Sequence, residues 1–430
     1  MIRDYILDNY NKNPEKIFLS YMDQTYSINQ FNESSNKIGA YLEATITNKK
    51  YIGLQISNPV FLLEAIIAAN RINLVPIIYP DYKNITDYIK ASNRDVDIDD
   101  DIIKRILIEN PYSLELTEKL YSENNIQIVL FTSGSSGPPK AVELSYGSIY
   151  NNALAWDNII NFNDDLYINC LPMHHISGLG IFFRTIIYNL QMKIVPFNIK
   201  YIYKQYSKPT IISLVPYMLK KIIDTYKDNM KFSYRAIIIG GNQLEKNIAE
   251  CAIKLNFPIY ISYGMTETCS GIAGFWANNQ NIKKYKYTPH KNVSIDVNNF
   301  IIKIQSSSLM SGYLGRKKIT DTLISNDTGV KYSNGEFSVL GRRDRIIVSG
   351  GENISLRTIE NKIKQIKSVK ECFAIGHPSK QWGDKLIVYI VENKNKKITK
   401  HSFYKKELSK MLPKFMIPKE IHFINNLKEI

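Results

Sequence analysis

Runs of consecutive apolar residues alternate with amphipathic stretches over roughly the first two thirds of the chain. Short runs that are apolar throughout are typical of strands buried on both faces of a parallel sheet, and the stretches between them have the period of helices. The strand-like runs are YIGLQIS, LVPIIYP, IQIVLFT, IISLVP, RAIIIGG and PIYISYG, and the clearest helical stretches are FLLEAIIAANRIN and YMLKKIIDTYK. This alternation predicts a layered α/β fold.

The pattern changes at about Ser294, where the segments VSIDV, FIIKIQ and EFSVLG alternate apolar and polar residues. Such alternation is typical of antiparallel strands with one solvated face. We predict a domain boundary in the region Gly341–Gly351, because a helix–strand–helix pattern follows it from roughly Ser355 to Ile430. The sequence therefore predicts a large multi-layer N-terminal domain, with β-sheets flanked by helices, and a small C-terminal α+β domain.

Composition and charge narrow the class of protein. The chain has 430 residues, 44% of them hydrophobic and 22% charged, which favours a soluble globular protein of two domains. Isolated lysines carry the net charge of +15, so we expect no nucleic acid as a partner. The N-terminus lacks a signal-peptide core, and Glu64 interrupts the most apolar stretch. We expect a cytoplasmic protein with no membrane span and with reduced cysteines, since no C-x-x-C pair occurs.

The segment FTSGSSGPPKA, residues 131–141, concentrates hydroxyl groups, glycines and one lysine after the apolar run IQIVL. Backbone amides of a glycine-rich turn can form a concave site for anions, and a lysine adds a mobile cation. Its G-x-x-G-x-x-K spacing differs from the Walker A motif, and a flexible linker is the alternative. Because a predicted helix, ELSYGSIYNNALAW, follows, we interpret it as a phosphate-binding loop in a strand–loop–helix unit.

YGMTET, residues 263–268, directly follows the apolar strand PIYIS, where α/β proteins commonly bind ligands. Tyr263 offers a ring that can stack on a base, Thr266 a hydroxyl, and Glu267 a hard oxygen suited to Mg²⁺. Taken alone, a solvated surface carboxylate explains Glu267 equally well.

LPMHHISGL, residues 171–179, contains two adjacent histidines, which do not face one another on a helix or a strand. A two-histidine metal site is therefore not expected, and no H-E-x-x-H motif occurs. A histidine of a substrate pocket and an ordinary packed histidine are both open interpretations. GRRDRIIVSGGENI, residues 341–354, indicates by itself only an ion pair and a turn.

Together and in this order, these motifs resemble those of the adenylate-forming superfamily, which includes acyl-CoA synthetases, peptide-synthetase adenylation domains and luciferases. The resemblance runs from about Tyr51 nearly to the C-terminus, and five modest motifs in sequence make it specific. It implies ATP, Mg²⁺ and coenzyme A as cofactors and co-substrate, with a carboxylic acid as the other substrate. It also implies that residues 344–430 form a small mobile domain that rotates on residues 1–343.

The resemblance assigns a role to each motif. Lys140, Thr266 and Glu267 are implied catalytic groups, and Glu267 is the implied Mg²⁺ ligand. The implied nucleotide-binding residues come from the loop, from GGNQL, from YGMTET and from a ribose site: Thr132, Ser133, Gly134, Ser135, Ser136, Gly137, Lys140, Gly240, Gly241, Tyr263, Gly264, Met265, Thr266, Asp327 and Arg342. The implied hinge is Asp344, and Gly350 and Gly351 are implied to lie beside the entering thiol.

Within the superfamily, LPMHHISGL with Arg184 beyond it, and SGGENI with GHPSKQWGD after it, are most similar to the o-succinylbenzoate–CoA ligases of menaquinone biosynthesis. The residues implied to line the acyl pocket are His175, which is also an implied catalytic group, Ser177, Gly178 and Leu179. Arg184 is implied to lie near an anionic acyl group, and a helix-surface arginine is the alternative. A ligase or carrier-loading enzyme for another aryl or fatty acid, and a degenerate non-catalytic nucleotide-binding homologue, stay open, as does a homodimer.

The sequence departs from the family pattern in three places. The segment between LVPIIYP and IQIVL is shorter than usual, and the Thr-Gly-Asp ribose motif reads Ser325-Asn326-Asp327. The family's C-terminal Gly-Lys segment is not matched before Ile430, and Lys428 lies too early for it. Without a cation in that role, we expect adenylation to be slower by roughly 10²–10³, while thiol transfer from a supplied acyl-adenylate is retained.

Overall fold

The computed structural model describes residues 2–46, 50–80, 86–92, 96–109, 122–132, 139–226, 233–319, 321–349, 352–379, 382–393 and 397–427. Contacts within the chain divide it into two compact units, Met1–Ser294 with Ile304–Leu323, and Ile295–Lys303 with Ile324–Ile430. The predicted α/β class is confirmed. The rotation point expected at Asp344 stays a prediction.

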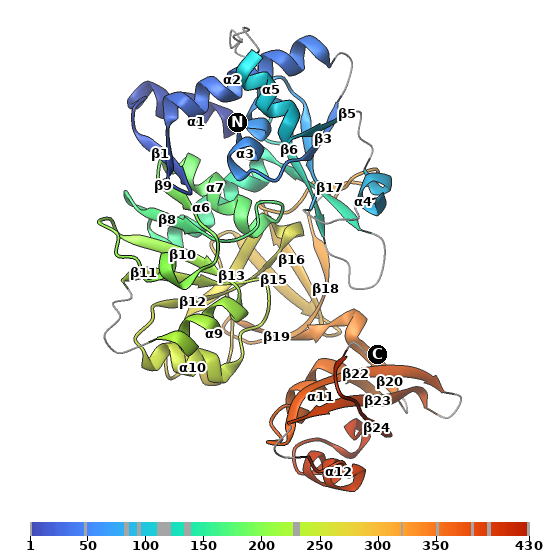
Figure 1. Ribbon diagram of the computed structural model, residues 1–430. Helices are drawn as coiled ribbons and strands as arrows, with labels where there is room; N and C mark the ends of the chain where they lie inside the picture. The colour runs from blue at the N-terminus through green and yellow to red at the C-terminus, as the bar shows by residue number, and fades with distance from the viewer. Residues whose placement is uncertain are drawn as a thin grey trace. The chain divides into compact units, whose positions relative to one another are not determined.

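Two sheets form the framework of the first unit (Figure 1). The nine-stranded sheet has the order β14-β13-β12-β11-β10-β8-β9-β1-β2, and its strands are β1 (Ile17–Tyr21), β2 (Gln24–Ser27), β8 (Leu166–Asn169), β9 (Gln191–Ile194), β10 (Thr210–Leu214), β11 (Tyr234–Ile239), β12 (Ile259–Met265), β13 (Ser270–Trp276) and β14 (Thr288–Pro289). The six-stranded sheet has the order β17-β7-β6-β4-β3-β5, and its strands are β3 (Tyr51–Gln55), β4 (Val75–Ile78), β5 (Val96–Asp99), β6 (Ile126–Thr132), β7 (Lys140–Ser145) and β17 (Gly312–Tyr313).

Helices connect and cover these strands. They are α1 (Ile2–Lys12), α2 (Ile28–Thr45), α3 (Pro59–Arg71), α4 (Thr86–Ala91), α5 (Asp100–Glu109), α6 (Tyr146–Ile160), α7 (Ile176–Ile187), α8 (Ile199–Ile202), α9 (Pro216–Thr225) and α10 (Lys246–Lys254), with single 3₁₀ turns η1 (Thr266–Thr268) and η2 (Asn281–Lys283). None of the helices in the described parts of the chain is long and apolar enough to cross a membrane.

The two sheets of the first unit are joined through a helical layer. Helix α3 packs on β3 and β4 of the six-stranded sheet, α7 packs on β8 and β9 of the nine-stranded sheet, and α1 contacts both helices. Phe18 of β1, Phe31 of α2 and Phe182 of α7 are fully buried in this layer, with ring centroids 5.3–6.2 Å apart. Burial of such large apolar side chains is the main source of stability of the unit.

The second unit holds the alternating strands and the C-terminal pattern. Most residues of a four-stranded sheet belong to it, and the strands of that sheet are β15 (Val293–Asn298), β16 (Ile301–Ser306), β18 (Leu323–Lys331) and β19 (Phe337–Arg342). Its other elements are η3 (Arg343–Arg345), β20 (Ile346–Ser349), β21 (Glu352–Ser355), α11 (Leu356–Ile363), β22 (Val369–Ser379), β23 (Gly383–Glu392), α12 (His401–Ser409), η4 (Lys414–Met416) and β24 (Glu420–Phe423). The last five strands form one sheet, which packs with α11 and α12 around a separate core.

One local prediction was wrong. Residues Glu143–Ser145, expected at the start of a helix, belong to β7, which returns antiparallel beside β6. Helix α6 begins only at Tyr146, where the Ser145 side chain accepts from the Ser148 amide and caps it. The predicted helix ELSYGSIYNNALAW included Glu143–Ser145, although these three residues are buried within a strand. The segment of residues 131–141 therefore lies in a strand–loop–strand–helix unit.

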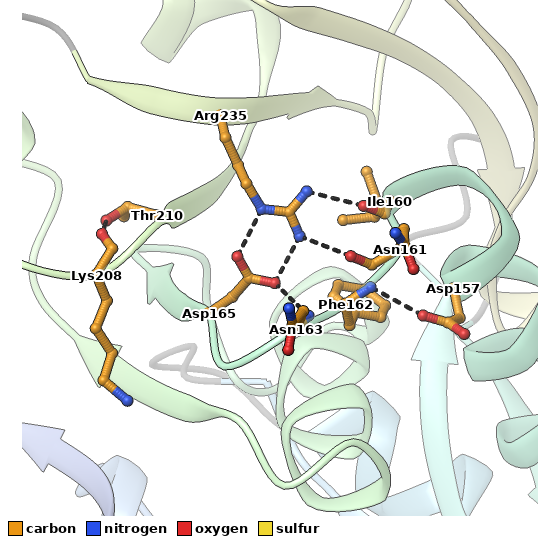
Figure 2. Close-up of polar contacts among 9 residues, drawn as sticks. All are labelled: Asp157, Ile160, Asn161, Phe162, Asn163, Asp165, Lys208, Thr210 and Arg235. Atoms are coloured by element: carbon orange, nitrogen blue, oxygen red, sulfur yellow. Dashed lines mark hydrogen bonds and ion pairs between the residues drawn. The ribbon is translucent and has the colours of Figure 1, made fainter.

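An ion pair fixes the start of β8 to β11 (Figure 2). The Arg235 guanidinium donates to both oxygens of Asp165, at 2.6 and 2.5 Å, and to the carbonyl oxygen of Ile160, at 2.8 Å. The Asp165 side chain is fully buried and also accepts from the Asn163 amide at 2.9 Å. A buried carboxylate is stable only when its oxygens are paired in this way. The pair therefore holds the end of α6 and the start of β8 against β11.

A second buried carboxyl group has fewer partners. Glu64, which interrupts the apolar face of α3, is 2% exposed, and its Oε2 atom has no hydrogen-bond partner among the described residues. Burial raises the pKa of this carboxyl to about 8. Glu64 is therefore mainly protonated in the folded protein at neutral pH. All four cysteines are free thiols: Cys170, Cys251, Cys269 and Cys372.

We predict that Arg235→Leu lowers the free energy of unfolding by about 2–4 kcal/mol, because it leaves the Asp165 carboxylate buried without its cation. Urea unfolding followed by circular dichroism measures the change. Lys220→Ala is the matched control, since Lys220 pairs with Asp224 at the surface, and it is expected to cause no measurable change. Equal effects of the two substitutions would contradict this account.

We predict that Glu64→Gln makes the protein less sensitive to pH. The folded state holds the Glu64 proton up to about pH 8, whereas the unfolded chain releases it near its ordinary pKa, so wild-type stability falls as pH rises between these values. The advantage of Glu64→Gln should be small at pH 5 and grow to the order of a few kcal/mol by pH 8. Urea unfolding of both proteins at several pH values tests this, and parallel curves would refute it.

Candidate active site

Three of the sequence motifs lie along one edge of the nine-stranded sheet. Strands β8, β10, β11 and β12 are parallel neighbours, so their carboxyl ends meet at the same edge. LPMHHISGL follows β8, GGNQL follows β11, and YGMTET spans the end of β12 and η1. The strand order therefore brings together segments that are about 90 residues apart in the sequence.

The segment GGNQL and the ring of Tyr263 form adjacent parts of this edge. Gly241 has a φ of +82°, which favours glycine, and a side chain added at Gly240 would meet no atom within 4 Å. The Tyr285 hydroxyl donates to the Leu244 carbonyl oxygen at 2.7 Å. The Tyr263 ring lies 5.8 Å from that of Tyr287. A face of open backbone beside an aromatic ring suits a flat heterocycle.

Lys140 and Glu267 come together through a residue that the sequence did not point to, Tyr313 of β17. The Lys140 ammonium lies over the Tyr313 ring, 5.3 Å from its centroid, and the Tyr313 hydroxyl donates to Glu267 Oε1 at 2.9 Å. Lys140 pairs with Thr132 across β6 and β7, which places both ends of the predicted phosphate loop here. Ser133, Gly134, Ser135, Ser136 and Gly137 lie outside the described residues.

The turn that carries Thr266 and Glu267 is held by its own hydrogen bonds. The Thr268 hydroxyl accepts from the Met265 amide at 3.0 Å and donates to the Ser270 carbonyl oxygen at 2.7 Å. A side chain at Gly264 would come within 2.0 Å of that same oxygen, so only glycine allows β12 and β13 to approach here. These constraints fix the backbone position from which the Glu267 side chain extends.

The residues near Glu267 fit a magnesium ion that takes most of its ligands from phosphate and water. Mg²⁺ is commonly held by one or two carboxylates plus phosphate oxygens rather than by a complete protein cage. Within the described ranges, no group of three or more His, Cys, Asp and Glu side chains could hold a metal ion by itself. Glu267 and a phosphate would together provide such a site.

The N-terminus of α7 carries the predicted acyl-pocket residues. His175 precedes the helix, and its half-buried ring has a pKa lowered by desolvation, so it is neutral at neutral pH. The rings of His174 and His175 lie 4.4 Å apart and are tilted by 57°; both residues precede the helix, so the expectation for a helix or a strand does not apply to them. A side chain at Gly178 would come within 2.4 Å of the Pro172 carbonyl oxygen. Leu179 is fully buried, whereas Ser177 is partly exposed.

Arg184 lies inside the protein, which rules out the alternative of a helix-surface arginine. It is 3% exposed, and its guanidinium carbon lies 5.2 Å from the Trp156 ring centroid and 5.6 Å from that of Tyr167. Nη2 is 3.5 Å from the Tyr167 hydroxyl, while Nε and Nη1 have no partner among the described residues. Burying a cation without an anion is costly, so Arg184 is a candidate to bind an anionic group.

The predicted ribose, hinge and thiol residues belong to the second unit. Asp327 of β18 pairs directly with Arg342 of β19, and the Asp327 amide donates to the Ser325 hydroxyl at 3.1 Å. Asp344 lies in η3. Gly350 and Gly351 lie outside the described residues. The structure thus brings Asp327 and Arg342 together within their own sheet.

Comparison with known protein families decides the class. A family model described as AMP-binding enzyme matches residues 81–300, and one described as AMP-binding enzyme C-terminal domain matches residues 358–429. The chain belongs to the AMP-binding enzyme family. The resemblance to the adenylate-forming superfamily is thereby confirmed.

Two relatives in this family are named as ligases of the subgroup whose motifs the sequence resembles. A 2-succinylbenzoate–CoA ligase of Lactococcus lactis is 27% identical over 96% of this chain and 94% of its own length. A 2-succinylbenzoate–CoA ligase of Staphylococcus aureus is 29% identical over 77% of this chain and 70% of its own. Both cover most of the first unit and its motifs.

Solved structures of the AMP-binding enzyme family share the fold. The o-succinylbenzoate CoA synthetase of Bacillus subtilis in complex with the acyl-adenylate intermediate OSB-AMP has a TM-score of 0.89 at 22% identity, over 98% of this chain and 94% of the other. ATP-bound MatB from Rhodopseudomonas palustris has a TM-score of 0.87 at 18% identity, over 99% and 96%. At these identities the likeness concerns the fold.

We predict that Tyr313→Phe weakens the binding of ATP with Mg²⁺ about tenfold, because it removes a hydrogen bond to the Glu267 carboxylate. Fluorescence titration with ATP, with and without Mg²⁺, measures this, and the loss should be much smaller without the metal. Tyr217→Phe, at a ring that is 65% exposed, is the control. A loss that is the same with and without Mg²⁺ would show that Tyr313 does not act through Glu267.

Proposed function

We propose that this chain is an ATP-dependent, AMP-forming acid–CoA ligase and that its acid is 2-succinylbenzoate. The observation that carries the choice of acid is Arg184 in the last turn of α7, which is buried with two donor nitrogens unpaired among the described residues. The relatives named 2-succinylbenzoate–CoA ligase support the same choice.

A dicarboxylate explains a buried cation better than a fatty acid does. One carboxylate of 2-succinylbenzoate is consumed when it is joined to AMP, and the other keeps its negative charge throughout the reaction. A fatty acid has no second charge, so it would leave the Arg184 guanidinium unpaired in the filled pocket, at a cost in binding free energy. The aromatic rings around Arg184 suit an aryl group as well as the cation.

In the first step, a substrate carboxylate oxygen attacks the α-phosphorus of ATP. The new bond is O–P, the bond between the α- and β-phosphates breaks, and pyrophosphate leaves with the negative charge. Both reactants are anions, so positive groups must lie where charge develops. We assign this role to Lys140 and to the amides of the loop that precedes it, with Thr266 as a donor to the α-phosphate. Bound Mg²⁺, held by Glu267, would neutralise phosphate charge.

In the second step, the sulfur of coenzyme A attacks the acyl carbon of the adenylate, the thioester bond forms, and AMP leaves. Neutral His175, at the start of α7, lies at the acyl side of the site in this assignment. Asp327 and Arg342 hold the ribose. We further propose that the small domain turns about Asp344, so that Gly350 and Gly351 lie beside the thiol during this step. Since all substrates are small molecules of the cytoplasm, we assign the protein to that compartment.

The test is an assay that measures the two steps separately. Exchange of labelled pyrophosphate into ATP, with 2-succinylbenzoate present, reports adenylation, and thioester formation from supplied acyl-adenylate and coenzyme A reports transfer. Exchange should be faster with 2-succinylbenzoate than with benzoate, malonate or a fatty acid, and transfer should be faster from the 2-succinylbenzoyl adenylate than from the adenylates of those acids. Faster reaction with one of those acids would overturn the choice of substrate. ATP binding without either step would indicate a non-catalytic homologue.

We predict that Arg184→Gln lowers kcat/KM for 2-succinylbenzoate about 100-fold, since it removes the charge that pairs with the remaining carboxylate. The KM for ATP should change little, because the side chain lies on the acyl side. Arg184→Lys should recover only part of the loss, as an ammonium cannot reproduce the planar donor pattern. An equal rise in both KM values would mean that Arg184 supports the fold of the whole site and does not select the acid.

A further inference from the structure

Helix α6 directly continues β7, the strand that begins with Lys140, and two of its buried polar side chains bond to segments on either side of Glu267. The first is Asn152, which is 3% exposed. Its Nδ2 atom donates to the carbonyl oxygens of Gly271, at 3.1 Å, and Thr268, at 3.4 Å. Asn152 therefore ties α6 to the end of η1 and to the start of β13, just after the Glu267 turn.

The second anchor is Ser148, which lies four residues earlier and thus on the same face of α6. Its side chain is also 3% exposed, and its hydroxyl donates to the Leu309 carbonyl oxygen at 2.5 Å. The next residue, Met310, donates its amide to the Glu267 carbonyl oxygen at 2.8 Å. Ser148 therefore holds, one peptide away, the segment that supports the backbone of Glu267.

Residues 309–313 connect these anchors back to β7. The Ser311 amide donates to the Glu143 carbonyl oxygen of β7 at 2.9 Å, and the Tyr313 hydroxyl donates to Glu267 Oε1 at 2.9 Å. The segment thus contacts both β7 and η1. Since β7 runs directly into α6, the strand, the helix, the turn and the segment form a closed ring of bonded elements.

The neighbouring asparagine of α6 has a different role. Asn151 donates from Nδ2 to the Gly147 carbonyl oxygen at 2.8 Å, within the same helix, so its side chain stabilises α6 alone. Asn152 donates to carbonyl groups 116 and 119 positions away in the chain. The two adjacent asparagines therefore separate the stability of the helix from its attachment to the Glu267 turn.

We propose that Asn152 and Ser148 are positioning residues, which set the separation between Lys140 and the Glu267 carboxylate. Each acts through the backbone that it holds. The inference rests on the proposed function, in which Lys140 neutralises the leaving pyrophosphate and Glu267 holds Mg²⁺. Both groups must meet one triphosphate, so a displacement of about 1 Å is expected to slow adenylation about 100-fold. Thiol transfer needs neither group, because pyrophosphate has already left.

The experiment measures the two steps separately in a pair of variants. Asn152→Leu keeps the approximate size of the side chain and removes its donor, and Asn151→Leu is the matched control. We expect Asn152→Leu to slow exchange of pyrophosphate into ATP, with 2-succinylbenzoate present, about 100-fold. It should leave thioester formation from supplied acyl-adenylate within about twofold, and Asn151→Leu should leave both rates within about twofold. Equal losses in the two steps would overturn the inference, since Asn152 would then support the fold of the whole unit.

The second anchor tests the same inference if Asn152→Leu does not fold. Ser148→Ala removes the hydroxyl and should slow exchange about tenfold while sparing transfer. Ser148→Thr keeps the hydroxyl and should retain most of the exchange rate. If the alanine and threonine variants slow exchange equally, the hydrogen bond to Leu309 does not position the site.

Binding of ATP with manganese(II) in place of magnesium gives a readout without turnover. Water proton relaxation measures the Kd of the manganese–ATP complex, and calorimetry measures the Kd of ATP alone. Asn152→Leu should raise the first about tenfold and leave the second within about twofold, whereas Asn151→Leu should change neither. An equal rise in both values, or no rise, would overturn the inference.

This measurement also separates the inference from the proposed function. If the wild-type protein binds the manganese–ATP complex but catalyses neither step with 2-succinylbenzoate or the other acids, the proposed function fails. A selective loss of manganese–ATP affinity in Asn152→Leu would then still show that Asn152 positions the metal ligand.

Discussion

The parallel pairing of β8, β10, β11 and β12 is the constraint on which the site depends. β8, β10, nearly all of β11 and the first three residues of β12 are buried, so their backbone groups must pair with neighbours and their register cannot slip without exposing apolar side chains. The pairing forces the chain to leave the sheet at one edge each time, and the segments that leave there carry the histidine, glycine and tyrosine motifs. The order of the strands therefore determines which motifs come together at this edge.

Three buried ionisable side chains of the first unit differ in how their charge is compensated. Asp165, inside the first unit, has a bidentate arginine, and Glu64 is kept neutral by its environment. Arg184 has no carboxylate partner among the described residues; its neighbours are aromatic rings and a neutral histidine. A folded protein does not retain such an arrangement for stability alone, since apolar residues of similar size would fill the space at lower cost. This is why the proposed function pairs Arg184 with a substrate of opposite charge.

Strands buried on both faces could be predicted from the sequence, because a short, continuous apolar run between turn residues is typical of a strand inside a parallel sheet. IQIVLFT, for example, corresponds to β6 residue for residue. The candidate residues at strand ends, such as Tyr263 and Glu267, could also be placed, since a parallel strand in this class ends at a ligand edge. Tyr313 could not, because it reaches Glu267 through an antiparallel return of the chain, and a two-residue strand has no periodic signal. For Glu143–Ser145 the local pattern favoured a helix, and the pairing with β6 prevailed.

The two-residue strand β17 joins the six-stranded sheet from a distant part of the chain. Residues Gly312 and Tyr313 pair with Val142 and Glu143, about 170 positions earlier in the chain, so closing this contact carries a large loop entropy. During synthesis, β7 would remain an uncovered edge until most of the protein had left the ribosome, with its backbone groups open to strand exchange. Lys140, at the start of that strand, and Tyr313 can therefore become neighbours only after residues 312 and 313 have been synthesised.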